Sequence, residues 1–240
     1  MGGSTYRRSM AKILFVITGV DHWTLADGTQ HPTGFWGEEA VAPYEAFKAA
    51  GHEITVATPG GVVPTVDKGS LAAEVNGGQE NADRIAGVIA KATEIQNPIR
   101  LEDVHLDDYA AVFYPGGHGP MEDLAVNADS GRLLVTALKS GKPLAVVCHG
   151  PAALLAAVDE GGTNAFAGYR VAAFSNAEET QAGLAEKAKW LLETRLTEAG
   201  VDVRVGEPWA PHVVVDRNLV TGQNPASSAP LAAEVLKKLA

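Results

Sequence analysis

Short apolar β-type runs alternate with longer helical segments along almost the whole chain. The expected strands are 12–18, 52–58, 109–114 and 143–147, and the helical segments that lie around them are 34–51, 81–97 and 130–140. Strands and helices that alternate in this way build a parallel sheet with helices on both faces. The sequence therefore predicts an α/β fold with a doubly wound, mainly parallel, flavodoxin-like sheet.

A second set of elements follows residue 147. They are a helix to about 158, a strand at 169–174, a long amphipathic helix at 177–199, short strands at 201–205, 212–215 and 219–221, and a last helix at 228–239. The strands near His212 and Leu219 are expected at a sheet edge, where antiparallel pairing occurs. No linker or repeat interrupts the series, so we expect one α/β domain over 11–240. Residues 1–10 are expected to be a disordered extension or a cloning remnant.

Composition narrows the partners and the compartment. The chain has 240 residues and a formal net charge of −10, with 19 scattered basic residues, which argues against nucleic acid as a partner. No apolar run approaches the roughly 20 residues that cross a bilayer, so we expect no membrane partner. A single cysteine and no secretory signal indicate a cytoplasmic location.

A cysteine follows the strand at 143–147 and constrains the chemistry. Cys148 is succeeded by His149, Gly150, Pro151 and small helix-compatible residues. This pattern predicts a buried strand, a tight turn and a helix that opens directly after it, which is a nucleophile elbow. N–H groups at a helix start lower a cysteine pKa. As the only cysteine, Cys148 has no intramolecular disulfide partner, and we interpret it as a nucleophile rather than a small buried hydrophobe.

Two further features accompany the elbow. His149 is expected to place its imidazole near a reacting carbon or its backbone N–H near an oxyanion, unless it is simply exposed at a helix start. The loop at 116–119 ends the strand at 109–114 and contains Gly117 and His118. Active sites of open parallel sheets form beyond the carboxyl ends of the strands, so this loop and the elbow are expected to share one crevice. A backbone N–H of the loop is expected to stabilise negative charge together with the N–H of His149.

An acidic pair precedes a proline in the segment at 34–51. Pro43 has no N–H to bond the carbonyl of Glu39, so a kinked or interrupted helix is expected there. Phe35 and Trp36 would supply dry surroundings that raise a carboxyl pKa. The alternative is an ordinary acidic pair, Glu38 and Glu39, that interacts favourably with the helix dipole.

A second acidic pair follows the strand at 169–174. A carboxylate of Glu178 or Glu179 could orient His149 as the third member of a triad. Capping of a helix by Asn176, with acidic residues in its first turn, explains the same residues equally well. Spacing alone does not separate the two interpretations.

The other histidines have no paired spacing with cysteine or carboxylate, so we expect no required metal and no cofactor. His22 and His31 bracket the loop after the first strand, where either could line the crevice.

Together these segments resemble the DJ-1/PfpI superfamily, with its class I glutamine amidotransferase-like fold, and within it the Hsp31-like branch that includes glutathione-independent glyoxalases. The matching segments are 33–39 with Pro43, 113–119, 145–151 and 221–228. The segment after Cys148 and the distal His212 differ from true glutamine amidotransferases, so that activity is not expected.

The resemblance implies roles for named residues. It implies Cys148 as the nucleophile, His149 as its acid/base partner and Glu39, four residues before Pro43, as the family's buried glutamate. The third acidic member falls on Glu179, with Glu178 as the competing alignment. The resemblance also implies a homodimer and a cysteine prone to oxidation.

Three functions follow from these expectations. The first is a glyoxalase III-type lyase that converts methylglyoxal, a 2-oxoaldehyde, and water to lactate, with a stress-protective role. The second is a cysteine hydrolase, either a peptidase or amidase or a protein deglycase. The third is a redox-responsive, chaperone-like stress protein without enzymatic activity.

Overall fold

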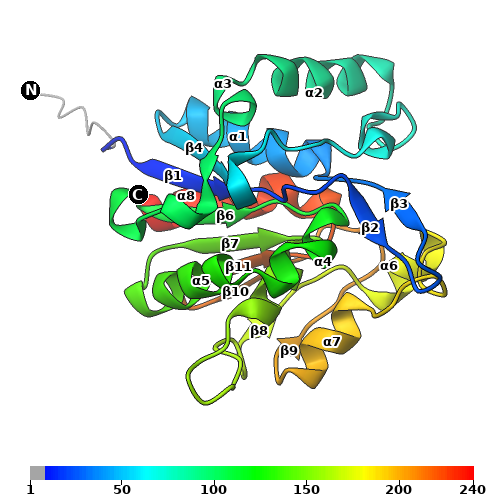
Figure 1. Ribbon diagram of the computed structural model, residues 1–240. Helices are drawn as coiled ribbons and strands as arrows, with labels where there is room; N and C mark the ends of the chain where they lie inside the picture. Colours follow the sequence, from blue (N-terminus) through cyan, green and yellow to red (C-terminus); the bar gives the residue numbers. More distant parts are fainter. Residues whose placement is uncertain (1–8) are drawn as a thin grey trace, which may run out of the picture.

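The computed structural model describes residues 9–240, and a seven-stranded sheet runs through its centre (Figure 1). The strand order is β10-β11-β7-β6-β1-β4-β5. Every neighbouring pair in this sheet is parallel except β10 with β11. The predicted doubly wound, mainly parallel α/β fold is therefore confirmed, and within this sheet only the pair of β10 and β11 at one edge is antiparallel.

The strands of the main sheet are short and mostly buried. They are β1 (Lys12–Val16), β4 (Glu53–Thr58), β5 (Ile99–Arg100), β6 (Ala111–Tyr114), β7 (Leu144–Val147), β10 (Val213–Asp216) and β11 (Leu219–Gly222). Two small sheets accompany it, and they pair β2 (His22–Thr24) with β3 (Gln30–Pro32) and β8 (Arg170–Val171) with β9 (Asp202–Val203).

Helices cover both faces of the main sheet. They are α1 (Gly37–Ala49), α2 (Gln79–Lys91), α3 (Thr93–Gln96), α4 (Gly119–Glu122), α5 (Ala128–Ser140), α6 (Asn176–Gln181), α7 (Leu192–Glu198) and α8 (Ser228–Leu239). Helices α1 and α8 pack together on one face, with α2 outside α1, and α5 lies on the other face (Figure 1). No helix within residues 9–240 is long and apolar enough to cross a membrane.

The central strands explain where the core lies. All four residues of β6 and of β7 are buried, as expected for strands with helices on both sides. Phe15 of β1 packs edge-on against Phe47 of α1 and Phe113 of β6. These aromatic contacts attach α1 to the sheet, and α1 carries one of the acidic pairs noted in the sequence.

Several predicted elements differ from the structure. The helix expected at 177–199 is wrong: α6 and α7 are separate, and residues 182–191 between them are irregular. Gly183, with φ +80°, follows the end of α6, which is the usual place for a glycine that stops a helix. The helix expected at 81–97 is divided at Ala92, and the strand at 169–174 shortens to Arg170–Val171 in a separate small sheet.

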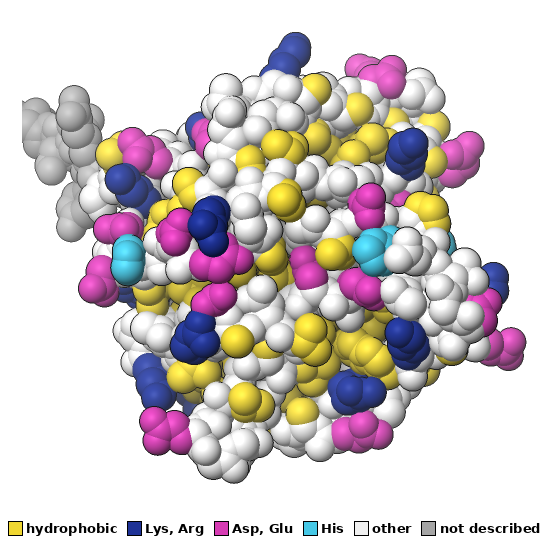
Figure 2. Space-filling model, in the orientation of Figure 1, with side chains coloured by type: hydrophobic (Ala, Val, Ile, Leu, Met, Phe, Trp, Pro, Cys, Tyr) yellow, Lys and Arg dark blue, Asp and Glu magenta, His cyan; other side chains and the backbone are white. Residues whose placement is uncertain are grey.

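Two expectations about helix shape also change. The helix predicted after the elbow is a 3₁₀ helix, Gly150–Ala156, and it ends slightly before the expected position at about 158. Helix α1 runs from Gly37 to Ala49 without interruption although Pro43 lies inside it. Residues 1–8 of the expected extension lie outside the described residues. On the face seen in Figure 2, acidic and basic side chains are interspersed without a large patch of one sign.

Candidate active site

Cys148 lies directly after β7, at the carboxyl edge of the sheet, in a strained turn. Its φ is +61°, in the left-handed region that non-glycine residues rarely adopt. The turn is held on both sides, because the Cys148 N–H donates to Gly222 O at 2.8 Å and its carbonyl accepts from Phe174 N at 3.0 Å. A strained residue fixed by its neighbours in this way is typical of a nucleophile elbow.

His149 faces the sulfur with one ring nitrogen and a carboxylate with the other. Its Nδ1 lies 3.5 Å from Cys148 Sγ, and its Nε2 lies 2.6 Å from Glu179 Oε2. Because the carboxylate can only accept, the Nε2 of the ring carries the proton. The Nδ1 lone pair then points toward the thiol, which is the arrangement that a general base needs.

Glu179 accepts hydrogen bonds from two imidazoles at once. Besides His149, the side chain of His118 donates from Nε2 to Glu179 Oε1 at 2.7 Å. Burial alone would raise the pKa of the Glu179 carboxyl, but the two imidazoles outweigh it and hold this pKa well below its usual range. Burial and the neighbouring His149 lower the pKa of His118. The anionic form of Glu179 is thus favoured by its two imidazole neighbours.

The neighbouring Glu178 has different partners, although it is just as deeply buried. Its two oxygens accept from the N–H and hydroxyl of Ser175, from Gln223, from Asn224 and from the backbone N–H of Trp209. With Ser175 it forms a capping box at the start of α6, so the predicted cap at Asn176 is off by one residue. Of the two acids, it is therefore Glu179 that contacts His149.

Glu39 approaches the cysteine from the first turn of α1. Its carboxyl is fully buried, and Oε1 accepts from Gly116 N at 2.9 Å. Oε2 has no nitrogen or oxygen partner among residues 9–240, and the carboxyl faces the Cys148 thiol. Burial raises the pKa of Glu39 well above its usual value, which favours the protonated carboxyl. Glu38, by contrast, is only half-buried and lies outside this cluster.

The same surroundings act on the thiol itself. Burial, followed by the proximity of Glu39, raises the pKa of Cys148 well above its usual range. The lower thiol pKa expected from the helix start is therefore wrong, because Cys148 is only 4% exposed and burial dominates. His149 Nδ1, which lies 3.5 Å from Sγ, is within reach of the thiol proton.

Two glycines let the loops of β6 and β7 meet. A Cβ on Gly116 would lie 2.6 Å from Glu39 Oε1, 2.7 Å from Val147 O and 2.8 Å from His149 N. Gly117 has φ +89°, and a Cβ there would lie 2.3 Å from Gly34 O. The glycine-rich loop predicted to face the elbow therefore does so, at a distance that only glycine permits.

Three backbone N–H groups at this junction are free to bind an anion. In residues 9–240, the N–H groups of Gly117, His118 and His149 make no hydrogen bond. These are the groups that the sequence predicted as oxyanion donors, and that role stays a prediction. Gly116 N, in the same loop, is already bonded to Glu39.

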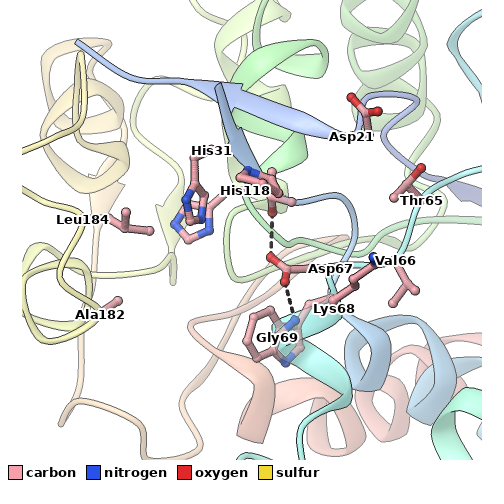
Figure 3. A pocket seen from close by; sticks show the side chains of 13 residues that line it. Asp21, His31, Thr65, Val66, Asp67, Lys68, Gly69, His118, Ala182 and Leu184 are labelled. Atoms are coloured by element: carbon pink, nitrogen blue, oxygen red, sulfur yellow. Dashed lines mark hydrogen bonds between the residues drawn. The ribbon is translucent and has the colours of Figure 1, made fainter. Parts of the chain in front are cut away.

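A small cavity lies against the sulfur, and a larger pocket borders it. The cavity has a volume of about 70 Å³ and is lined by Trp36, Gly117, His118, Cys148, His149, Phe174, Ala182, Trp209 and Pro225. The outer pocket measures about 740 Å³ and shares Trp36, His118 and Ala182 with the cavity. Figure 3 shows His31, one of the two histidines expected near the crevice, and Asp67 lining the outer pocket. Asp67 is held there by Thr33 and by Gly69 N.

Sequence reasoning missed several of these groups. The sequence predicted a role only for the backbone N–H of His118. In the structure its imidazole also contacts Glu179 and stacks on Trp23, with ring centres 4.8 Å apart. Trp209 lines the cavity but lies in a segment without any motif. His22, the other candidate for the crevice, bonds Asp21 instead.

His118, His149 and Glu179 also have the composition of a metal site. Their candidate ligand atoms all lie within 4.8 Å of one another. A metal would require both Nε2 atoms to lose their protons, whereas each lies at hydrogen-bond distance from the carboxylate. The expectation that no metal is required stays a prediction.

A parallel sheet with a strained cysteine at a strand end, a His–Glu pair and a buried glutamate defines a class of cysteine-containing α/β proteins. Residues 32–238 match the DJ-1/PfpI family. The chain belongs to the DJ-1/PfpI family.

Individual relatives refine this assignment. The protein/nucleic acid deglycase HchA of Staphylococcus aureus is 27% identical over 228 residues, which cover 93% of this chain and 78% of the relative. The 24 kDa rapid encystment protein of Francisella tularensis has a TM-score of 0.85 at 28% identity and covers 96% of this chain, with all of its own chain matched. Glyoxalase III of Candida albicans has a TM-score of 0.83 at 26% identity, with 95% of this chain and 97% of its own covered. These similarities support the Hsp31-like branch expected from the sequence.

Proposed function

We propose that this protein is a cysteine-dependent, glutathione-independent glyoxalase that converts methylglyoxal and related 2-oxoaldehydes to 2-hydroxy acids. The observation that carries the proposal is the contact of Cys148 Sγ with His149 Nδ1, backed by Glu179 and placed on a cavity of about 70 Å³. The similarity to a glyoxalase III supports the same reaction class. No external thiol is needed because the chain provides its own.

The reaction begins with transfer of the thiol proton to His149. The resulting imidazolium is stabilised by Glu179, whose low pKa keeps it anionic. A protonated Glu39 next to the sulfur carries no negative charge that would oppose the thiolate, and its proton can be donated to it. The raised thiol pKa in the resting site therefore does not prevent formation of a short-lived thiolate.

The thiolate then captures the aldehyde. Sγ forms a bond to carbon 1, and the electron pair of the C=O bond moves onto oxygen 1. The free N–H groups of Gly117, His118 and His149 stabilise that charge until the imidazolium returns its proton to the oxygen. The product of this step is a hemithioacetal on Cys148, and His149 is again a neutral base.

Isomerisation and hydrolysis complete the sequence. His149 takes the proton from carbon 1 to form an enediol and returns it to carbon 2, while Glu39 moves a proton from oxygen 1 to oxygen 2. The product is a thioester of the 2-hydroxy acid. Water adds to its carbonyl carbon, the C–S bond breaks, and the acid leaves with the thiol restored.

The test is lactate formation from methylglyoxal in the absence of glutathione. The protein is expected to form lactate, and Cys148→Ala is expected to form none above the uncatalysed rate. Substantial lactate production by that variant would refute the scheme.

A second candidate is the release of a 2-oxoaldehyde from an amine that it has modified. The outer pocket of about 740 Å³ favours it, because a group attached through carbon 1 could extend there past the shared wall. The HchA relatives are named for deglycase activity. Turnover of a glycated amine without any turnover of free methylglyoxal would favour this function over the first, and cleavage of peptide or amide bonds alone would favour the hydrolase.

We further propose that the protein acts as a homodimer in the cytoplasm with a stress-protective role, as the sequence resemblance implies. Light scattering of the purified protein tests the dimer. The non-enzymatic alternative predicts that suppression of aggregation survives Cys148→Ala while no substrate is turned over.

A further inference from the structure

Trp209 forms one wall of the cavity at Cys148. Its ring packs edge-on against Phe174, with ring centroids 5.5 Å apart, and both side chains line the cavity. Trp209 is nevertheless 44% exposed. The indole of Trp209 therefore lies between the cavity at Cys148 and the solvent.

The backbone of Trp209 is strained, and its side chain is tethered. Its φ is +65°, in the left-handed region that costs a bulky residue energy. The indole Nε1 donates to Gln181 Oε1 at 2.7 Å, and the backbone N–H donates to Glu178 Oε2 at 2.9 Å. Strain of this kind persists only where surrounding contacts impose it, and it concentrates at functional sites.

Glu178 links this wall to the rest of the site. It is fully buried, and besides Trp209 it accepts hydrogen bonds from Ser175, Gln223 and Asn224. The next residue, Glu179, bonds His149. Two adjacent residues of α6 therefore hold both parts of the site: Glu178 binds the segment of Trp209, and Glu179 binds His149.

The segment after β11 holds the same wall from a second side. Gln223 exchanges hydrogen bonds with the N–H and carbonyl of Gly206, and Asn224 donates to Ala210 O at 2.7 Å. These contacts give a physical role to the residues around 221–228, which the proposed reaction does not use. They form a clamp that keeps residues 206–210 over the cavity.

We propose that Trp209 is a specificity-determining residue, whose indole limits the size of the group on carbon 2 of the 2-oxoaldehyde. This inference rests on the proposed glyoxalase function. The cavity of about 70 Å³ admits a methyl group but is too small for a phenyl ring while the indole is present. Trp209 does not line the outer pocket, so a group that reached that pocket from carbon 1 would not meet the indole. Small aliphatic 2-oxoaldehydes are therefore the preferred substrates.

The experiment compares kcat/KM for methylglyoxal and for phenylglyoxal. Trp209→Ala is expected to raise the phenylglyoxal/methylglyoxal ratio about 10-fold over the unmodified protein, the scale on which hydrophobic pockets discriminate by size. Trp209→Phe retains a ring and is expected to keep most of the original preference. Trp190→Ala, a tryptophan that lines a different pocket, is expected to leave the ratio unchanged. An unchanged ratio in Trp209→Ala would overturn the proposal.

A second readout does not depend on turnover. Cys148 is alkylated with iodoacetamide, which is small, and with N-phenylmaleimide, which is bulky. Trp209→Ala is expected to accelerate the bulky reagent at least several-fold more than the small one. If the proposed function fails, neither aldehyde is turned over but this selective acceleration persists. If the wall is wrong, aldehydes are turned over and both reagents change together or not at all.

Discussion

The two adjacent glutamates at the start of α6 give the sharpest prediction, because the same substitution should have opposite consequences at the two positions. Glu179→Gln replaces one carboxylate oxygen by an NH₂ group. Both neighbours, His118 and His149, donate Nε2–H to that carboxylate, so one of them then faces a donor. If His149 changes tautomer, its Nδ1 carries the proton and cannot accept one from Cys148. Loss of the orienting carboxylate in catalytic triads costs about 10⁴-fold in kcat.

Glu178→Gln should instead act on the fold. The NH₂ group would face Trp209 N and Asn224 Nδ2 at the position of Oε2, so two of the five hydrogen bonds are lost. Hydrogen bonds to a charged group contribute about 1.5–3 kcal/mol each, which gives about 3–6 kcal/mol in the free energy of unfolding. For a chain of this length, a loss of 1 kcal/mol lowers Tm by about 2–4 °C, so a decrease of roughly 6–24 °C is expected.

The assay measures both variants in the same two ways. Thermal unfolding gives Tm, and lactate formation at a temperature below both transitions gives kcat. Glu179→Gln, which disturbs one of two imidazole hydrogen bonds, is expected to lose most activity with a smaller fall in Tm than Glu178→Gln. Glu178→Gln is expected to show the larger fall in Tm while it retains far more activity than Glu179→Gln. Equal losses of kcat in the two variants, or a larger fall in Tm for Glu179→Gln, would refute the division of roles.

Three further predictions concern packing, pH and metals. Gly116→Ala should lower the free energy of unfolding by about 1–3 kcal/mol, because its Cβ would lie under 3.0 Å from three atoms. Gly87→Ala on α2, where a Cβ would meet nothing within 4 Å, should instead raise this free energy by about 0.5–1 kcal/mol. Urea denaturation of both variants measures the two changes. Below pH 4.5, the usual glutamate pKa, Glu39→Gln should match the unmodified protein in stability. As pH rises toward the raised pKa of the folded state, the variant should become increasingly the more stable of the two. The reason is that the folded protein holds the Glu39 proton more tightly than the unfolded chain does. A pH series of denaturation curves checks the sign, and a difference that shrinks as pH rises would contradict it. Dialysis against EDTA should leave lactate formation unchanged, and a loss that Zn²⁺ restores would instead assign a metal to the cluster of His118, His149 and Glu179.

Much of this site could be predicted from local sequence patterns. A short apolar run that ends at Cys148 and continues into small residues specifies the elbow, and the glycines at 116 and 117 indicate a close approach of two loops. Both features depend on backbone conformation over a few residues, which local sequence determines well. Parallel order in an α/β sheet then brings neighbouring strand ends together without further information.

Other parts of the site depend on contacts between distant segments. Glu178 and Glu179 are identical residue types at the start of one helix, and only the placement of residues 209, 223 and 224 decides which acid is used as a clamp. Trp209 has no local signal because its role comes from these tertiary contacts. The thiol pKa was also not predictable, because burial of the whole residue outweighs the helix start beside it.

The expected helix at 177–199 was wrong for a different reason. The apolar spacing at 184–196 is compatible with a helix, but Gly183 in the left-handed region ends α6 first. A glycine inside a helical pattern is a local stop signal, and in this segment it determines the structure. The irregular stretch between α6 and α7, residues 182–191, supplies Ala182 and Leu184 to the outer pocket.

The bond between Cys148 Sγ and carbon 1 of the aldehyde is the step on which every later one depends. Rapid quenching during turnover of methylglyoxal, followed by mass spectrometry of the peptide that contains Cys148, measures it directly. The account predicts a substrate-derived adduct on this residue that forms before lactate does, and neither adduct nor lactate in Cys148→Ser. Lactate formation by Cys148→Ser at the rate of the unmodified protein, or steady turnover with an unmodified Cys148 peptide at every time point, would contradict it.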